Sequence, residues 1–412
     1  MITRERWKAL EHHGMQLFNT LTGRLETFTD RDGSVGLYVC GVTPYDTTHI
    51  GHAFTFLTYD ILTRYLRYKG LDVTYVQNVT DIDDDILRKA GEVGMNWREL
   101  ADRETERYLQ DMADLNALPF DHYVKATDHI DDMIGIIERL VEGGYAYPVN
   151  GSVYFQVAKD PDFGQLSKIP RDQMLDAANE RGNVPDDPNK RDPLDFILWQ
   201  ATKEGEPAWD SPWGPGRPGW HIECSAMSTH FLGDTIDIHG GGGDLIFPHH
   251  EAEIAQTEKA TGQTPFVRYW MHVAMVAYQG TKMSKSLGNL VLARELLETY
   301  SADTIRLCLF SHHYRTEWEY LDDEIEEWSR VAADLEEAFN FPADGPDEPL
   351  DVSTLRDQFF QALENDLDTP EAIRALQEMA LSILEAPESD DVRDAQNELG
   401  RCAGILGLTL EG

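Results

Sequence analysis

A strand–helix–strand pattern early in the sequence constrains the fold most strongly. The apolar run LYVCGV at residues 37–42 ends in the turn TPYD, and a helix-like stretch follows from Ala53 to Lys69. The segment DVTYVQNVTDID, which starts at Asp72, is again rich in residues typical of strands. Strand, helix and strand in this order form a βαβ unit, the building block of a parallel sheet. Because the strand-like segments TIDIHG and WMHVAMVAY come later, we expect an α/β fold.

The rest of the chain divides by composition and periodicity. Amphipathic helices are expected within 97–142, a hairpin within GGYAYPVNGSVYFQV, and an irregular polar stretch at 181–193. The segment NFPADGPDEPLD has the Pro, Gly and Asp content of a linker, and only helical patterns follow it. The expected parts are an N-terminal segment at 1–36, a sheet domain at 37–330 with an insertion at about 120–215, a linker at 340–351, and a C-terminal helical bundle at 352–412.

The chain of 412 residues carries 74 acidic and 35 basic side chains, a formal charge of −39. This charge disfavours non-specific nucleic-acid binding but fits solubility in a salty cytoplasm, so it does not exclude an RNA partner. No apolar run approaches the roughly 20 residues of a membrane span, and the start lacks a secretory signal. Four widely spaced cysteines are typical of a reducing compartment. We expect a cytoplasmic monomer with no membrane partner.

A pair of histidines follows the first expected strand. In Thr48-His49-Ile50-Gly51-His52, the imidazoles of His49 and His52 lie three residues apart at the start of a helix, where phosphates are also favoured by the helix N-terminus. Taken alone, two histidines near a turn are more often ordinary surface residues.

A pair of lysines lies some 230 residues later, in Lys282-Met283-Ser284-Lys285-Ser286. Lys282 and Lys285 on a loop can form a cationic clamp for a triphosphate, although such a pair is normally just solvated. The two motifs in this order resemble the HIGH and KMSKS signature of class I aminoacyl-tRNA synthetases. That resemblance implies a Rossmann-like parallel-sheet catalytic domain.

Scattered side chains suggest a metal site. Cys40 closes the first strand, Cys224 lies in GWHIECSAM, and His249 and Glu253 in FPHHEAEIA share one helix face at i and i+4. Two thiolates, an imidazole and a carboxylate suit zinc. A buried cysteine pair beside an ordinary polar helix explains the same residues about equally well. The neighbouring pair His250-Glu251 is expected to point elsewhere, as partners of the ligands.

Longer stretches carry a more specific resemblance. YVCGVTPYDTTHIGHA, NVTDIDDDI, GRPGWHIECSAM, DIHGGGGDLIFPHHEAEIAQ and KMSKSLGN resemble the cysteinyl-tRNA synthetase superfamily, which includes the mycothiol-pathway ligase that joins cysteine to glucosaminyl-inositol. The resemblance implies one Zn²⁺ per chain, held by Cys40, Cys224, His249 and Glu253, that binds the substrate thiolate. A thiolate is a strong zinc ligand and an alcohol is not, so the ion distinguishes cysteine from serine.

The resemblance also implies the remaining roles. His49, His52, Lys282 and Lys285 contact the phosphates of ATP, which carries Mg²⁺. The residues expected at the cysteine and adenylate sites are Gly41, Thr43, Thr55, Asn78, Thr80, Trp220, His239, Gly242, Gly243, Asp244 and Val276. The cysteine carboxylate attacks the α-phosphate, giving cysteinyl-adenylate and pyrophosphate, and an acceptor then expels AMP.

The acceptor is the open question. We expect a small amine, as in the mycothiol-type ligase, because only about 125 residues follow KMSKS, which predicts that an anticodon-binding domain is absent. Residues 331–412 contain 20 Asp or Glu, four Arg and no Lys, and Phe54 stands where the tRNA enzymes usually carry arginine. Glu253 favours the alternative, a cysteinyl-tRNA synthetase without that domain. A non-catalytic zinc- or nucleotide-binding paralogue is a remote alternative, since the HIGH, KMSKS and zinc-ligand positions are all intact.

Overall fold

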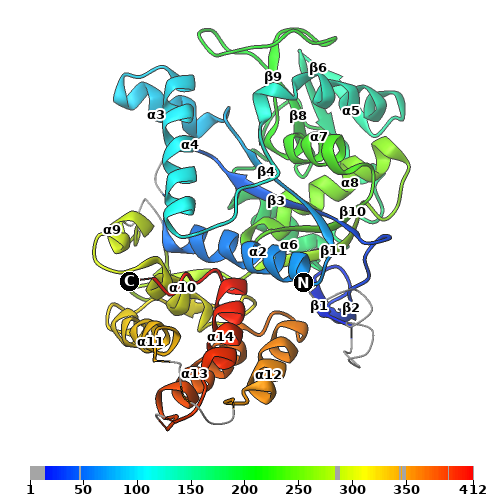
Figure 1. Cartoon of the computed structure of the whole chain (residues 1–412). Helices are drawn as coiled ribbons and strands as arrows, with labels where there is room; N and C mark the ends of the chain where they lie inside the picture. The colour runs from blue at the N-terminus through cyan, green and yellow to red at the C-terminus, as the bar shows by residue number, and fades with distance from the viewer. Residues whose placement is uncertain are drawn as a thin grey trace.

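The computed structural model describes residues 14–45, 48–283, 288–342, 345, 349–387 and 389–411. Five parallel strands form its central sheet, in the order β11-β10-β3-β4-β5 (Figure 1). These strands span Ser34–Val42 (β3), Asp72–Val79 (β4), His122–Lys125 (β5), Ile236–Gly242 (β10) and Val267–Val273 (β11). The expectation of an α/β fold with a parallel sheet is confirmed.

The alternation of side chains along β3 explains how the sheet is covered. Val35, Leu37 and Val39 enter one hydrophobic core, and Tyr38 and Cys40 enter a second core on the opposite face. Helix α2 (Ile50–Tyr68) packs on the first face, while α7 (Trp220–Leu232) packs on the second face with α5 (Ile130–Glu142) and α8 (Glu251–Thr261) beside it (Figure 1). A strand that is buried on both faces requires the near-continuous apolar sequence that β3 has.

The strand order sets the position of the site. Strands β3 and β10 are neighbours, but the chain leaves β3 through α2 and β4 toward one edge of the sheet and continues from β10 to β11 at the other edge. In open parallel sheets, the crevice outside the carboxyl ends of two such strands is the usual ligand site. The HIGH motif follows β3 and the glycine run 240–243 ends β10, so both lie at this crevice.

Two structural boundaries differ from the sequence-based expectation. Helix α2 begins at Ile50 rather than Ala53, so His49 becomes its N-cap residue. The region 97–142 contains not only α4 (Trp97–Asp114) and α5 but also β5, which pairs in parallel with β4. Because β5 completes the central sheet, the start of the expected insertion at about 120 falls within this sheet.

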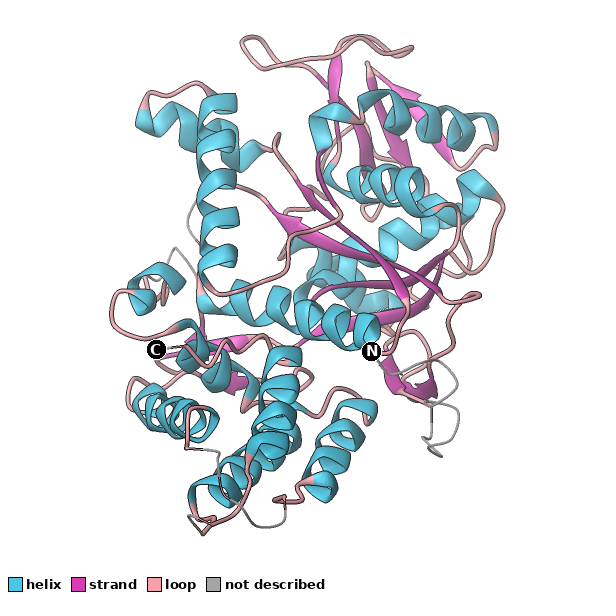
Figure 2. Cartoon of the chain, in the orientation of Figure 1, coloured by secondary structure: helices cyan, strands magenta, loops and turns pink. Residues whose placement is uncertain are grey.

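The remainder of the expected insertion forms a unit of its own. Strands β6 (Ala146–Val149), β7 (Ser152–Phe155), β8 (Phe196–Ala201) and β9 (Gly216–Pro218) make a four-stranded antiparallel sheet, and α6 (Arg171–Asn179) lies between β7 and β8 in the sequence. The expected hairpin is the β6–β7 pair. Figure 2 shows this second sheet beyond the helices that cover the central one.

Smaller elements flank the central sheet. A hairpin, β1 (Gln16–Asn19) and β2 (Arg24–Thr27), lies within the expected N-terminal segment, of which residues 1–13 are outside the described part. Helix α3 (Asp84–Val93) precedes α4. Short strands β12 (Val276–Tyr278), β13 (Thr281–Lys282) and β14 (Trp318–Glu319) form a third sheet, and α9 spans Ala293–Leu297.

The C-terminal part is mainly helical, with α10 (Ala302–Phe310), α11 (Glu324–Phe339), α12 (Ser353–Glu364), α13 (Thr369–Leu384) and α14 (Arg393–Ile405). The fully buried Arg306 joins this bundle to the sheet domain, because its guanidinium donates to Asp60 on α2 and to the carbonyl oxygens of Leu115 and Leu406. The expected linker at 340–351 falls partly outside the described residues. No helix in the described ranges is long and apolar enough to cross a membrane.

Candidate functional site

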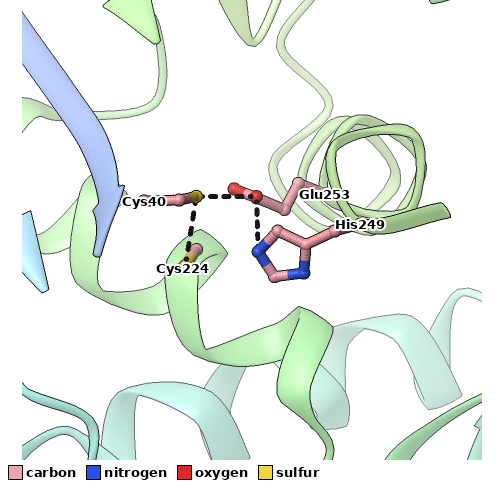
Figure 3. A group of neighbouring side chains, drawn as sticks. All are labelled: Cys40, Cys224, His249 and Glu253. Atoms are coloured by element: carbon pink, nitrogen blue, oxygen red, sulfur yellow. Dashed lines mark hydrogen bonds and ion pairs between the residues drawn. The ribbon is translucent and has the colours of Figure 1, made fainter. Parts of the chain in front are cut away.

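Four side chains from distant segments meet at the carboxyl end of β3. Cys40 comes from β3, Cys224 from α7, Glu253 from α8, and His249 from the turn that precedes α8 (Figure 3). The two sulfur atoms are 3.5 Å apart, and Glu253 Oε1 lies 3.5 Å from Cys40 Sγ and 3.1 Å from His249 Nε2. Ligand atoms of a tetrahedral zinc site are roughly 3.3–3.8 Å apart, so these three separations are close to those of such a site. The four residues are defined here as the Cys40 cluster.

Buried polar atoms without hydrogen bonds support a cation site at the Cys40 cluster. His239 Nδ1, His249 Nε2 and Glu253 Oε2 are buried and have no hydrogen bond among the described residues. Leaving buried polar atoms without hydrogen bonds costs free energy unless a metal or another ligand satisfies them. Two of these atoms, His249 Nε2 and Glu253 Oε2, belong to the Cys40 cluster, and together with its thiols they fit a soft-to-borderline divalent ion.

Burial sets the protonation of the Cys40 cluster when no ion is present. It raises the pKa of the Cys40 and Cys224 thiols and of the Glu253 carboxyl, and it lowers the pKa of His249. Each shift favours the uncharged form, because an isolated charge is poorly solvated in the interior. A bound cation reverses this preference for the thiols and the carboxyl, since it stabilises the thiolates and the carboxylate.

The neighbouring His250 does not point away from the Cys40 cluster, so that expectation is wrong. Its Nε2 lies 3.3 Å from Cys40 Sγ. The backbone of residues 246–250 forms a π-type turn in which Phe247 is extended (φ −138°, ψ 134°), so the regular helical phase is broken just before the two histidines. Sequence spacing in a regular helix would separate adjacent side chains by about 100° and cannot anticipate this turn.

His239 also reaches the cluster. Its Nε2 lies 3.4 Å from Cys40 Sγ and 3.5 Å from Glu253 Oε2, although the sequence predicts it only as a pocket residue. Cys40, His239, His250 and Glu253 thus form a second set whose ligand atoms are mutually close, and it shares Cys40 and Glu253 with the first. The first set alone contains both thiols, the strongest ligands for zinc.

Glu251 does point elsewhere, as expected. Its buried carboxylate accepts backbone N–H groups of Leu166 (3.1 Å) and Ser167 (2.8 Å). This contact ties the insertion to the first turn of α8, the helix that carries Glu253.

Two aromatic neighbours hold the ring of His249. Trp220 stacks on it with a centroid separation of 4.1 Å and an interplanar angle of 19°. At the ring edge, His221 Nδ1 lies 2.9 Å from His249 Nδ1. Sequence reasoning placed Trp220 at the cysteine pocket and missed His221, whose only signal is its position three residues before Cys224.

The carboxyl end of β4 lines the same crevice. The Gly41 N–H donates to Asn78 Oδ1 (2.8 Å), and a Cβ atom at Gly41 would lie 1.7 Å from the Asn78 carbonyl oxygen, so only glycine fits there. The Thr80 hydroxyl donates to the buried carboxylate of Glu223 (2.8 Å). Thr43 follows β3 and is half-buried. The predicted pocket residues Gly41 and Asn78 therefore lie on adjacent strands, and Thr80 directly follows the second of them.

The two histidines of the HIGH motif stack at the start of α2. Their ring centroids are 3.8 Å apart, and His49 Nδ1 accepts the Gly51 N–H (3.1 Å). The first turn of α2 contains no acidic side chain, so nothing in that turn offsets the positive end of this 19-residue helix. Thr55, predicted at the adenylate site, donates to the Gly51 carbonyl oxygen within the helix (3.0 Å).

The remaining predicted residues are spread along the crevice or fall outside the description. Gly242 and Gly243 mark the end of β10, Asp244 pairs with Arg181 (3.1 Å), and Val276 is buried in β12. Lys285 lies outside the described residues, and of Lys282 only the backbone, in β13, is described.

Comparison with known proteins agrees with this geometry. Residues 27–330 match the family described as "tRNA synthetases class I (C) catalytic domain". A "Cysteine--tRNA ligase" of Dehalococcoides mccartyi is 45% identical over 406 residues, which is 96% of this chain and 86% of that protein. Another of Chromohalobacter salexigens is 45% identical over 399 residues, 96% of this chain and 85% of that protein.

Solved structures show the same fold at low sequence identity. Mycobacterium tuberculosis methionyl-tRNA synthetase in complex with methionyl-adenylate aligns with a TM-score of 0.64 at 15% identity, covering 90% of this chain and 89% of that one. Thermus thermophilus arginyl-tRNA synthetase aligns with a TM-score of 0.59 at 14% identity, covering 93% and 83%.

Proposed function

This chain belongs to the cysteine–tRNA ligase family of class I tRNA synthetases, and from that premise we propose that it attaches cysteine to tRNA. It is an ATP-dependent cysteine ligase. The observation that carries the proposal is the position of the Cys40 cluster at the carboxyl end of β3, on the strand that leads directly to the stacked histidines of α2.

We assign Zn²⁺ to the Cys40 cluster, held by Cys40, Cys224, His249 and Glu253. When bound, the ion supplies a Lewis-acidic position that takes the thiolate of cysteine and not the hydroxyl of serine. Trp220 and His221 orient His249. Thr80 and Asn78 line the crevice beside Cys224.

ATP is assigned to the neighbouring half of the crevice. The phosphates would meet the N-terminus of α2 with His49 and His52, and the glycines at the end of β10 leave room for the nucleotide. Lys282 and Lys285 would stabilise the negative charge that develops as the cysteine carboxylate attacks the α-phosphate in line and pyrophosphate leaves. Mg²⁺ is expected on the phosphates.

The choice of tRNA reverses our sequence-based preference for a small amine acceptor, which finds no support in the comparisons. One of its arguments also fails structurally. Phe54 is fully buried and packs edge-on against Trp318 with a centroid separation of 5.6 Å, so it belongs to the core below α2 and cannot contact an acceptor. The acidic composition of residues 331–412 remains an argument for the small acceptor, but a salt-adapted tRNA enzyme is also acidic.

A side-by-side transfer assay tests the acceptor. With ATP and labelled cysteine, cysteinyl-tRNA should form when unfractionated tRNA is added, and glucosaminyl-inositol should not accelerate AMP release. The assay is run at low and high salt, because affinity for RNA depends steeply on ionic strength. Rapid AMP release with the amino sugar and no charged tRNA at either salt concentration would restore the small-amine alternative.

A further inference from the structure

A second cluster of metal-ligating side chains lies outside the crevice. His129 directly precedes α5, Asp132 lies in the first turn of α5, and His230 lies in the last turn of α7. One ligand atom from each lies within 4.8 Å of the other two. We propose that these three residues form a second divalent-metal site, which takes an ion such as Zn²⁺ through two imidazoles and one carboxylate.

The two rings converge on a single oxygen. His129 Nδ1 lies 2.8 Å and His230 Nδ1 lies 3.1 Å from the same atom, Asp132 Oδ2. The ring centroids are 4.8 Å apart with an interplanar angle of 68°, so both Nδ1 atoms face one region from different directions. An ion placed between these three atoms would take the two nitrogen lone pairs and the carboxylate oxygen as ligands and would replace the two direct contacts.

The ligand set and its spacing suit a first-row divalent ion. Imidazole nitrogen and carboxylate oxygen bind such an ion at about 2.0–2.2 Å, which places ligand atoms roughly 3.3–3.5 Å apart. The two nitrogen–oxygen distances of 2.8 and 3.1 Å therefore have to open by roughly 0.2–0.7 Å. The side chains of Asp132 and His230 are 42% and 47% exposed, so they can rotate by this amount and leave the remaining coordination positions to water.

The site is distinct from the Cys40 cluster although both use α7. Cys224 and His230 are six residues apart on this helix, which corresponds to about 9 Å along its axis and to a different face. An ion at the second site would join the start of α5 to the end of α7, two helices that already pack together. It is therefore a structural clamp on the helix that carries Cys224.

Binding of Co²⁺ to the full chain measures the number of metal sites and distinguishes the two sites. In equilibrium dialysis against Co²⁺, the wild-type protein should bind two ions, and the site with two thiolates should add an intense sulfur-to-cobalt charge-transfer band in the near ultraviolet. The His230→Ala variant should bind one ion and keep that band. The Cys224→Ala variant should also bind one ion, without the band of a dithiolate site. Because the number of bound ions is measured without any assay of activity, the test of the second site is independent of the proposed function.

His122→Ala is the matched control, since His122 on β5 contacts Phe231 (ring centroids 4.6 Å apart) but is not in the three-residue group. It should still bind two ions. If His230→Ala folds poorly by circular dichroism, Asp132→Asn replaces it. A single ion on the wild-type protein together with the sulfur-to-cobalt band, two ions on folded His230→Ala and Asp132→Asn proteins, or loss of an ion from His122→Ala would each overturn the proposal.

Discussion

His221 Nδ1 and His249 Nδ1 lie 2.9 Å apart, so one of the two rings donates to the other. Burial lowers the pKa of His221 to about 4, which leaves this ring neutral near pH 7 and able to accept. When His221 accepts, His249 carries its proton on Nδ1, and its Nε2, which faces Glu253, has a lone pair for a metal ion. In this arrangement, the neighbouring histidine holds the tautomer that coordination at Nε2 requires.

We predict that His221→Phe weakens zinc binding at the Cys40 cluster by about 10- to 100-fold, the usual effect of removing a partner that orients a ligand. Phenylalanine keeps a ring of similar size but cannot accept a hydrogen bond. Zinc affinity is measured by competition with a chromophoric chelator, and His122→Phe on β5 serves as the control. Equal zinc affinity in the wild-type and His221→Phe proteins would show that His249 needs no such partner.

Removal of the metal should abolish activation of cysteine. We predict that the chelated protein, and Cys224→Ala, lose the cysteine-dependent exchange of labelled pyrophosphate into ATP, because the thiol-selecting ligand is lost. Zinc should restore exchange to the chelated wild-type protein and not to the variant. Serine should support no exchange in any of these samples. A metal-free protein that still exchanges with cysteine at the full rate would refute the assignment.

The sequence predicts the Cys40 cluster well in some respects. Cys40 ends a strand, and His249 and Glu253 lie four residues apart, so their approach follows from regular geometry once the fold is known. His239 and His250 reach the same cluster for reasons that spacing does not reveal. His250 depends on the π-type turn at 246–250, and His239 depends on the pairing of β10 with β3, a contact between segments about 200 residues apart.

Burial is the property that the sequence reveals least. In the sequence, Phe54 favours a small amine acceptor because it stands where the tRNA enzymes usually carry arginine, yet its side chain is fully buried in the core. The start of the insertion is also difficult to predict from the sequence. The four residues of β5 are too short and too polar to be recognised as a strand, and only their pairing with β4 assigns them to the central sheet.

Lys285 lies outside the described residues, so its role stays a prediction from the KMSKS motif. We expect Lys285→Ala to slow adenylate formation by about a hundredfold or more, because the lysine acts on charge that develops in the transition state. The affinity for cysteine should change little. Pre-steady-state formation of cysteinyl-adenylate separates these two quantities. An unchanged rate with weaker cysteine binding would mean that the lysine belongs to the amino-acid pocket instead.

Arg306 holds the helical bundle against α2. Its guanidinium is fully buried and pairs with Asp60, a residue that is itself only 3% exposed. Removing one partner of a buried ion pair leaves the other charge poorly solvated and typically costs about 3–5 kcal/mol of the free energy of unfolding. Arg64 also contacts Asp60 (2.9 Å) and offsets part of this loss, so we expect Arg306→Met to lower stability by about 2–4 kcal/mol.

Urea denaturation at fixed salt concentration measures this change, and the double variant Arg306→Met/Asp60→Leu separates its causes. If the cost comes from the uncompensated carboxylate, replacing Asp60 as well should recover a large part of the lost stability, because both buried charges are then gone. Arg374→Met is the control, since Arg374 is an exposed bundle residue that pairs only locally with Glu371. If the double variant is as unstable as the sum of the two single variants, the guanidinium acts mainly through its hydrogen bonds to Leu115 and Leu406, and the Asp60 pair contributes little.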